Sequence, residues 1–136
     1  MKEKKKKVKS LAKVKSDLQE IFNTYIRKRD NGQPCISCGQ CKTLQAGHFY
    51  TVKMYDGLRF DEDNVNGECA GCNCFDDMHL LGYRNNLIRK IGEERFNALV
   101  EKAADYKKNG YKWTRSELLE KIVYYKEKLA QLDRNI

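Results

Sequence analysis

Two short stretches decide the fold of this chain: CISCGQC at Cys35–Cys41 and CAGCNCF at Cys69–Phe75. Each holds a Cys-x-x-Cys turn, which places two sulfur atoms about 3.5–4 Å apart, the edge of a zinc tetrahedron with Zn–S bonds of ~2.3 Å. Two such turns predict one saturated, structural zinc site on Cys35, Cys38, Cys69 and Cys72. The alternative, a pair of redox motifs, lacks the βαβ surroundings of a thioredoxin-like site.

Two further cysteines leave the exact ligand set open. Cys41 lies three residues after Cys38, so Cys38 and Cys41 form a second possible Cys-x-x-Cys pair that would shift the site by one ligand. Cys74 follows Cys72 at a less usual spacing. We favour Cys35 with Cys38, and the sequence assigns no role to Cys41 or Cys74.

Composition narrows the class of protein. With 136 residues, the chain is long enough for one domain or two small lobes, and 40 % hydrophobic residues allow a modest core. No stretch of 18 apolar residues is present, so we expect no membrane span and a cytoplasmic protein. In that compartment six cysteines favour metal binding over structural disulfides.

Positive charge is concentrated at the N-terminus. Residues 1–16 hold eight lysines and one glutamate, a net +7, whereas the whole chain carries +8. A lysine-rich tail usually meets a polyanion, most often nucleic acid, although it can also be a solvated extension. The residues predicted to contact nucleic acid there are Lys4, Lys5, Lys6, Lys7 and Lys9.

Periodicity predicts a helix followed by a hairpin. Apolar residues at spacings of 3 and 4 indicate a helix over 8–29, with a stripe that suits core packing better than a coiled-coil seam. Aromatic and β-branched residues predict a strand over 48–55. Asp56-Gly57 is a hairpin-turn signal, and residues 58–60 are expected to form the return strand.

Three helices are predicted after the second cysteine pair. Their apolar spacing places them at about 80–92, 93–103 and 114–132, and Thr114 with Glu117 forms a capping box at the start of the last. The fold class is therefore α+β and mostly α: a small zinc-bound ββα hairpin flanked by helices. We divide the chain into 1–29, 30–92 and 93–136, namely basic tail with helix, zinc-bound core, and C-terminal helical hairpin.

One histidine and two asparagines accompany the cysteines. His48 lies between the two pairs on the first predicted strand, Asn64 follows the return strand, and Asn73 directly follows Cys72. A lone histidine is often only structural. Here, however, the order Cys-x-x-Cys, His, Asn, Cys-x-x-Cys-Asn suggests that His48 belongs to a functional site.

This order resembles the HNH, or His-Me finger, nucleases, whose ββα element carries a His, a central Asn and a terminal His or Asn. The zinc-stapled form is similar to phage endonuclease VII. From about residue 17 to 132, CISCG, AGHFY, RFDEDN, C..CN, GYRNNLIRKIG and KWTRSELLEKIVYYKEKL together resemble the NinG/Rap family of phage recombination nucleases. The resemblance implies a structure-specific endonuclease acting on branched DNA such as Holliday junctions and D-loops, in the cytoplasm of the bacterial host of a phage or prophage.

The resemblance also implies roles for particular residues. His48 would be the general base, because a neutral imidazole titrates near working pH. Asn73 would offer an oxygen ligand to a catalytic Mg²⁺ or Mn²⁺ ion. Asn64 would tie the hairpin loop and orient His48. Two symmetric cuts across a junction suggest a homodimer.

One departure from the family pattern concerns the catalytic ion. Many His-Me fingers place a metal-binding Asp directly before the His, where this chain has Gly47. Asp63 is our favoured replacement, although His48 itself could contact the ion. The other candidate carboxylates are Asp61, which could instead form an Asx-turn, and Asp76 and Asp77.

Other readings stay open. Arg59 could clamp a phosphate or be an ordinary surface arginine, and His79 has no assigned role. The chain could also be a zinc-containing DNA-binding module without catalysis, which would need the cysteines and lysines but not His48, Asn64 and Asn73. A sequence-specific HNH nuclease is the third candidate, and it would need a base-reading element that we do not find.

Overall fold

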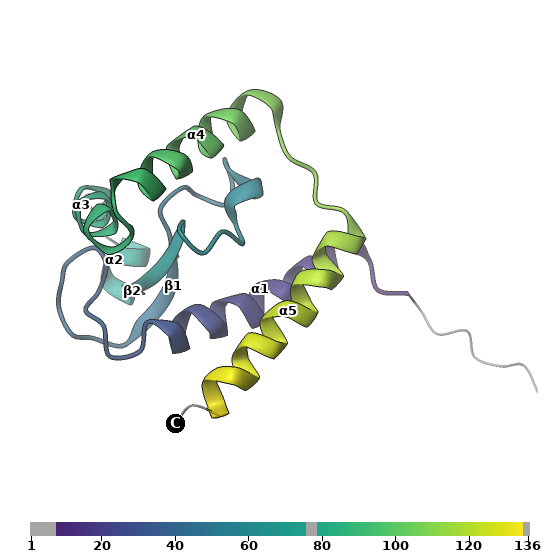
Figure 1. The fold of residues 1–136 in the computed structure, drawn as a ribbon, viewed down its shortest axis with the longest axis horizontal. Coiled ribbons are helices and arrows are strands. Elements are labelled where there is room, and N and C mark those ends of the chain that lie inside the picture. The colour runs from purple at the N-terminus through teal and green to yellow at the C-terminus, as the bar shows by residue number, and fades with distance from the viewer. Residues whose placement is uncertain (1–7, 76–78, 135–136) are drawn as a thin grey trace, which may run out of the picture.

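A two-stranded hairpin lies between two pairs of helices (Figure 1), in a computed structural model that describes residues 8–75 and 79–134. This mostly helical α+β arrangement agrees with the fold class expected from the sequence. The elements, in chain order, are α1 (Leu11–Arg29), β1 (Leu44–His48), the 3-10 turn η1 (Asp56–Leu58), β2 (Val65–Cys69), α2 (Ala70–Phe75), α3 (His79–Ile91), α4 (Glu93–Asn109) and α5 (Arg115–Arg134).

The strands differ from those predicted. β1 ends at His48, so the strand expected over 48–55 is wrong, and β2 is formed by residues 65–69, where we predicted no strand. Asp56-Gly57 begins η1 rather than a hairpin turn, and the return strand over 58–60 is also wrong. The aromatic side chains after His48 pack against the α3–α4 core instead, because strand propensity yields to tertiary packing.

The two strands pair antiparallel in a register that sets which side chains share a face. Leu44 pairs with Cys69 and His48 with Val65, so β1 and β2 run together over their full length. Residues 49–64 form one long loop between them. His48 therefore stands at the point where the first strand gives way to the loop.

α1 and α5 form the first helical pair, side by side in Figure 1. The apolar stripe of α1 is buried against α5 and the hairpin loop, which confirms core packing as its role. Ser10 caps α1 by accepting a hydrogen bond from the backbone N–H of Lys13. The buried residues of this core include Val14, Leu18, Phe22, Ile26, Phe60, Val65, Leu118 and Tyr125.

α5 begins with the predicted cap. Thr114 Oγ1 accepts a hydrogen bond of 3.2 Å from the backbone N–H of Glu117. The side chain of Glu117 does not complete the box, because it accepts a hydrogen bond from the Tyr111 hydroxyl at 2.6 Å.

Among residues 8–75 and 79–134, no helix is both long and apolar enough to cross a membrane.

α3 and α4 form the second helical pair and cover the other side of the hairpin (Figure 1). Gly82 allows α3 to approach the first cysteine loop closely, because a Cβ at this position would collide with the carbonyl oxygen of Ser37. The next residue of α3, Tyr83, lies in the interior and is fully buried. Its hydroxyl donates a 2.7 Å hydrogen bond to the carbonyl oxygen of Gly47, directly before His48.

A buried carboxylate joins α1, β2 and α3. Asp30 is 3 % exposed and accepts hydrogen bonds from Arg29, Lys90 and the backbone N–H of Gly67, at 2.8–2.9 Å. Burial alone would raise the pKa of Asp30, but Arg29 and the other donors bring it below its usual value. The carboxylate therefore stays ionised and holds the end of α1 against the hairpin.

Candidate functional site

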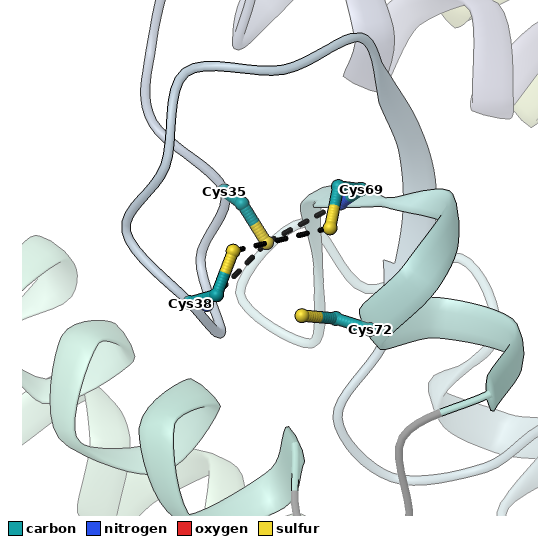
Figure 2. Close-up of side chains that lie close together, drawn as sticks. All are labelled: Cys35, Cys38, Cys69 and Cys72. Atoms are coloured by element: carbon teal, nitrogen blue, oxygen red, sulfur yellow. Dashed lines mark hydrogen bonds between the residues drawn. The ribbon is translucent and has the colours of Figure 1, made fainter.

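The predicted zinc ligands form a compact cluster. The Sγ atoms of Cys35, Cys38, Cys69 and Cys72 all lie within 4.8 Å of one another, and those of Cys38 and Cys69 are 3.9 Å apart. Figure 2 shows the four side chains pointing toward a common centre, two from the loop after α1 and two from the junction of β2 with α2. Cys41 and Cys74 are exposed and lie outside this cluster, so the first pair is not shifted by one ligand.

The surroundings of the cluster suit a metal-bound thiolate site. The backbone N–H groups of Cys38 and Cys69 donate to the Sγ atom of Cys35, at 3.5 and 3.3 Å. Burial raises the pKa of Cys72, whereas the backbone N–H of Cys72 lowers the pKa of Cys69 to about 7. A tetrahedron with ~2.3 Å Zn–S bonds has edges of about 3.8 Å, close to the 3.9 Å between the Sγ atoms of Cys38 and Cys69. The four cysteines can therefore bind a structural zinc.

His48 is the last residue of β1 and is only partly exposed. Its Nε2 atom lies 3.0 Å from the carbonyl oxygen of Arg59. A carbonyl only accepts, so a neutral His48 carries its proton on Nε2 and keeps a lone pair on Nδ1. Burial lowers the pKa of His48 below its ordinary value, and the Arg59 carbonyl opposes this only in part. The imidazole is therefore neutral at neutral pH.

Asn64 closes the long loop that follows His48. Its side chain is fully buried, accepts a 2.8 Å hydrogen bond from the backbone N–H of Tyr50 and donates to the carbonyl oxygens of Tyr50 and Leu58, both at 3.1 Å. The backbone continues this closure, because Phe49 N–H donates to the Asn64 carbonyl at 2.9 Å. These contacts fit the loop-tying role expected for Asn64 and leave its side chain little freedom to bind a metal.

Asn73 lies on α2, the short helix that directly follows β2. Its side-chain amide nitrogen donates a 2.9 Å hydrogen bond to Oε1 of Gln45, which projects from β1 three residues before His48. Cys74 also contacts this Gln45 oxygen, at 3.8 Å. Gln45 and Asn73 thus bring two amide groups together on an exposed part of the hairpin. Our sequence reasoning gave Gln45 no role, because its contact with Asn73 depends on how α2 folds back over β1.

The carboxylates proposed for the catalytic ion are engaged elsewhere. Asp63 forms an ion pair with Arg95 of α4. Asp61 accepts a 2.9 Å hydrogen bond from the backbone N–H of Asp63, which confirms its Asx-turn, and also pairs with Lys102. No contact described for Asp63 or Asp61 reaches His48 or Asn73. Asp76 and Asp77 lie outside the described residues.

The cations predicted to bind DNA have internal partners where they are described. The Arg59 side chain is 20 % exposed, and its guanidinium bonds Gln19 at 2.7 Å and Asp56 at 3.2 Å. Lys9 pairs with Asp17 of α1 at 2.9 Å. Lys4, Lys5, Lys6 and Lys7 lie outside the described residues.

The hairpin itself carries a buried carboxylate that we did not predict. Glu68 of β2 is fully buried, and its Oε2 atom is bonded by the Ser37 hydroxyl and by Nδ1 of His79, the latter at 2.7 Å. Within the described ranges, its Oε1 atom has no hydrogen-bond partner. Glu68 thus joins the first cysteine loop to the start of α3. Because β2 is buried along its whole length, alternation along this strand gives no signal for the orientation of Glu68.

These features define a small, mostly helical protein in which four clustered cysteines lie where the loop after α1 meets the junction of β2 with α2. Residues 1–135 match the family described as "Bacteriophage Lambda NinG protein", and the chain belongs to this family. The NinG family part of our resemblance is thereby confirmed.

Named relatives come from several phages. The chain is 38 % identical over 116 residues to "Protein ninG" of Salmonella phage P22 and 36 % identical to that of Escherichia phage 933W, each comparison covering 84 % of this chain and 55 % of the relative. It is 35 % identical to that of Escherichia phage lambda, again over 84 % of this chain and over 54 % of the relative. The chain therefore spans about half the length of these relatives. No solved structure matches it.

Proposed function

We propose that this protein is a structure-specific DNA endonuclease of the HNH, or His-Me finger, type. Its substrates would be branched recombination intermediates such as Holliday junctions and D-loops, cut by metal-dependent hydrolysis of a phosphodiester. It would act in the cytoplasm of a bacterial host, as a homodimer because resolving a junction needs two symmetric cuts.

One observation carries the proposal: a neutral histidine stands at the end of β1, in a hairpin whose loop is closed by an asparagine. His48 is held by the Arg59 carbonyl, the loop is tied by Asn64, and Asn73 follows on α2. This strand–loop–strand–helix order, with His, Asn and Asn in sequence, resembles the ββα element of the HNH nucleases. The cysteine cluster lies at the junction of β2 with α2. Zinc bound there would fix β2 and α2 relative to the loop after α1.

His48 would act as the general base. With its proton on Nε2 bonded to the Arg59 carbonyl, the imidazole has an unprotonated Nδ1 that would take a proton from a water molecule attacking phosphorus. The lowered pKa of His48 keeps this nitrogen unprotonated at neutral pH. Asn64 would hold the loop that carries the Arg59 carbonyl and so limit rotation of the ring.

The amides of Gln45 and Asn73 are the candidate ligands for a catalytic Mg²⁺ or Mn²⁺ ion. Side-chain carbonyl oxygens are ligands that hard divalent ions accept, and the Asn73 amide nitrogen already donates a hydrogen bond to the Gln45 oxygen. A bound ion would neutralise charge on the phosphate and on the leaving oxygen. Since both ligands are neutral and Asp63 pairs with Arg95, we expect weak ion binding in the absence of DNA.

The deciding experiment compares cleavage of a four-way junction with cleavage of a linear duplex of the same sequence, in Mg²⁺, Mn²⁺ and EDTA. His48→Ala should cut the junction at least roughly 10²-fold more slowly, the low end for loss of a general base. Junction affinity and zinc content should stay unchanged, because the imidazole acts in the chemical step and the four-cysteine set is complete. Cys41→Ser, at an exposed position outside the cluster, is the matched control.

Each alternative function predicts a different result in these assays. A folded, zinc-loaded His48→Ala protein that cuts junctions at the wild-type rate would remove His48 from catalysis. Junction binding without cleavage by the wild-type protein in either metal would favour the DNA-binding module. Equal cleavage of junction and duplex at one recurring sequence would favour a sequence-specific nuclease.

A further inference from the structure

The orientation of His48 depends on one peptide group of the long loop. The hydrogen bond from Nε2 to the carbonyl oxygen of Arg59 measures 3.0 Å. Moving this carbonyl would free the ring to rotate or to place its proton on Nδ1 instead, and Nδ1 would then no longer accept a proton. Whatever fixes the Arg59 carbonyl therefore decides which imidazole nitrogen is available as a base.

α1 fixes this part of the loop from outside. Nε of Arg59 donates a 2.7 Å hydrogen bond to Oε1 of Gln19, and a terminal guanidinium nitrogen of Arg59 donates to Asp56 at 3.2 Å. Asp56 is in turn bonded to Lys15 of α1 at 2.5 Å. η1 and the residue after it are thus tied to two successive turns of α1.

Gln19 is well suited to hold Arg59. Its side-chain nitrogen donates a 2.7 Å hydrogen bond to Asn23 one turn along α1, which leaves Oε1 aimed at the loop. The Arg59 guanidinium also lies 5.4 Å from the ring centroid of Phe60, a residue of the α1–α5 core. A guanidinium held by Gln19, Asp56 and Phe60 is better placed to position its own backbone than to clamp a phosphate.

We propose that Gln19 is a positioning residue for His48, acting through Arg59. Gln19 holds the Arg59 side chain, this fixes the peptide that follows η1, and its carbonyl selects the His48 tautomer with the proton on Nε2. The inference deepens the proposed nuclease function, on which its kinetic consequence rests. The tautomer itself can be measured whether or not the protein cuts DNA.

The test uses the fact that the chain has two histidines. In ¹⁵N-labelled full-length protein at neutral pH, long-range ¹H–¹⁵N spectra of imidazoles distinguish the two neutral tautomers, and His48→Ala assigns the signals. The wild-type His48 should show the Nε2–H form. Gln19→Ala should shift His48 toward a mixture of tautomers while leaving His79 unchanged, because His79 is bonded to Glu68 instead.

Kinetics on the junction provide the second measurement. Gln19→Ala should lower kcat by about 3- to 10-fold, in the range of one lost side-chain hydrogen bond, with KM unchanged because binding groups are untouched. Gln19→Glu keeps an acceptor oxygen for Arg59 and should restore both the tautomer and kcat. Glu20→Ala, at the next and exposed position of α1, is the matched control.

The outcomes separate the two proposals. A Gln19→Ala protein that keeps the wild-type His48 tautomer and kcat would overturn the inference. Equal losses in Gln19→Ala and Gln19→Glu would also overturn it, since the acceptor oxygen would then be irrelevant. If the wild-type protein cuts no DNA, the nuclease proposal fails, and the His48 spectra alone decide whether Gln19 positions the ring.

Discussion

Glu68 of β2 occupies the space into which a side chain at Gly47 of β1 would project. A Cβ built on Gly47 would lie 2.8 Å from the Cβ of Glu68 and closer still to its Oε1 atom. Glu68 cannot move away cheaply, because Ser37 and His79 hold its other carboxylate oxygen. The position directly before His48 therefore has no room for a side chain. This gives a physical reason why the chain has no aspartate there.

The closed position predicts a stability effect. Gly47→Ala should lower the free energy of unfolding by about 1–3 kcal/mol, the usual cost of overpacking. Gly71→Ala is the control, because a Cβ on Gly71 meets no atom within 4 Å and Ala is the better helix former in α2. Urea unfolding with zinc present measures both. Identical urea midpoints for the two variants would show that Glu68 moves aside at no cost in stability.

A second prediction concerns the cysteines. Cys72→Ser should lose the metal and unfold the hairpin, because binding at such a site contributes folding free energy. Cys74→Ser, two residues away and exposed, should retain one metal ion per chain. Metal analysis and circular dichroism of the purified proteins provide the measurement. The absence of zinc and iron from the wild-type protein would refute the site.

The proposed role of His48 as general base predicts how cleavage depends on pH. A general base works only when deprotonated, so the rate should be constant above the His48 pKa and fall as pH decreases through it. Burial places that pKa below the ordinary value of about 6.5, so the fall should begin on the acid side of 6.5. Single-turnover rates from pH 5 to 8, with folding checked at each pH, provide the profile. A rate that falls already above pH 7 would contradict the assignment.

The lysine-rich N-terminus should supply affinity without specificity. Ser10 caps α1 and α1 begins at Leu11, so a deletion of residues 1–7 removes lysines and spares the helix. Binding to junction and duplex should weaken by similar factors, and the salt slope should fall by about 0.9 for each lost phosphate contact. Affinity measured between 50 and 200 mM salt tests this. An unchanged slope would mean that these lysines do not touch phosphate.

Local spacing made the cysteine site predictable, whereas the strands were not predicted correctly. Cys35 with Cys38, and Cys69 with Cys72, each need only a short turn to bring their sulfurs together, and the structure clusters all four. The stripe of α1 was equally predictable, because Val14, Leu18 and Tyr25 repeat with the helical period and all three are buried in the core.

The surroundings of His48 could not be read in this way. The strand predicted over 48–55 failed because its aromatic residues, such as Phe49, pack against Phe96 of α4, a contact that no local pattern encodes. The Arg59 carbonyl on His48 and the Gln45 amide on Asn73 likewise depend on how distant segments fold together. The histidine and asparagines were chosen as candidates by residue type and order, but their hydrogen-bond partners required the three-dimensional structure.

The pairing of α1 with α5 has a consequence for the order of folding. A ribosome makes α1 well before α5, its main helical partner, which ends at Arg134. The apolar stripe of α1 therefore stays uncovered while the zinc ligands, complete at Cys72, are already available to capture metal. Nascent chains should hold zinc before the α1–α5 core closes, and in that interval they are most exposed to aggregation and to chaperones.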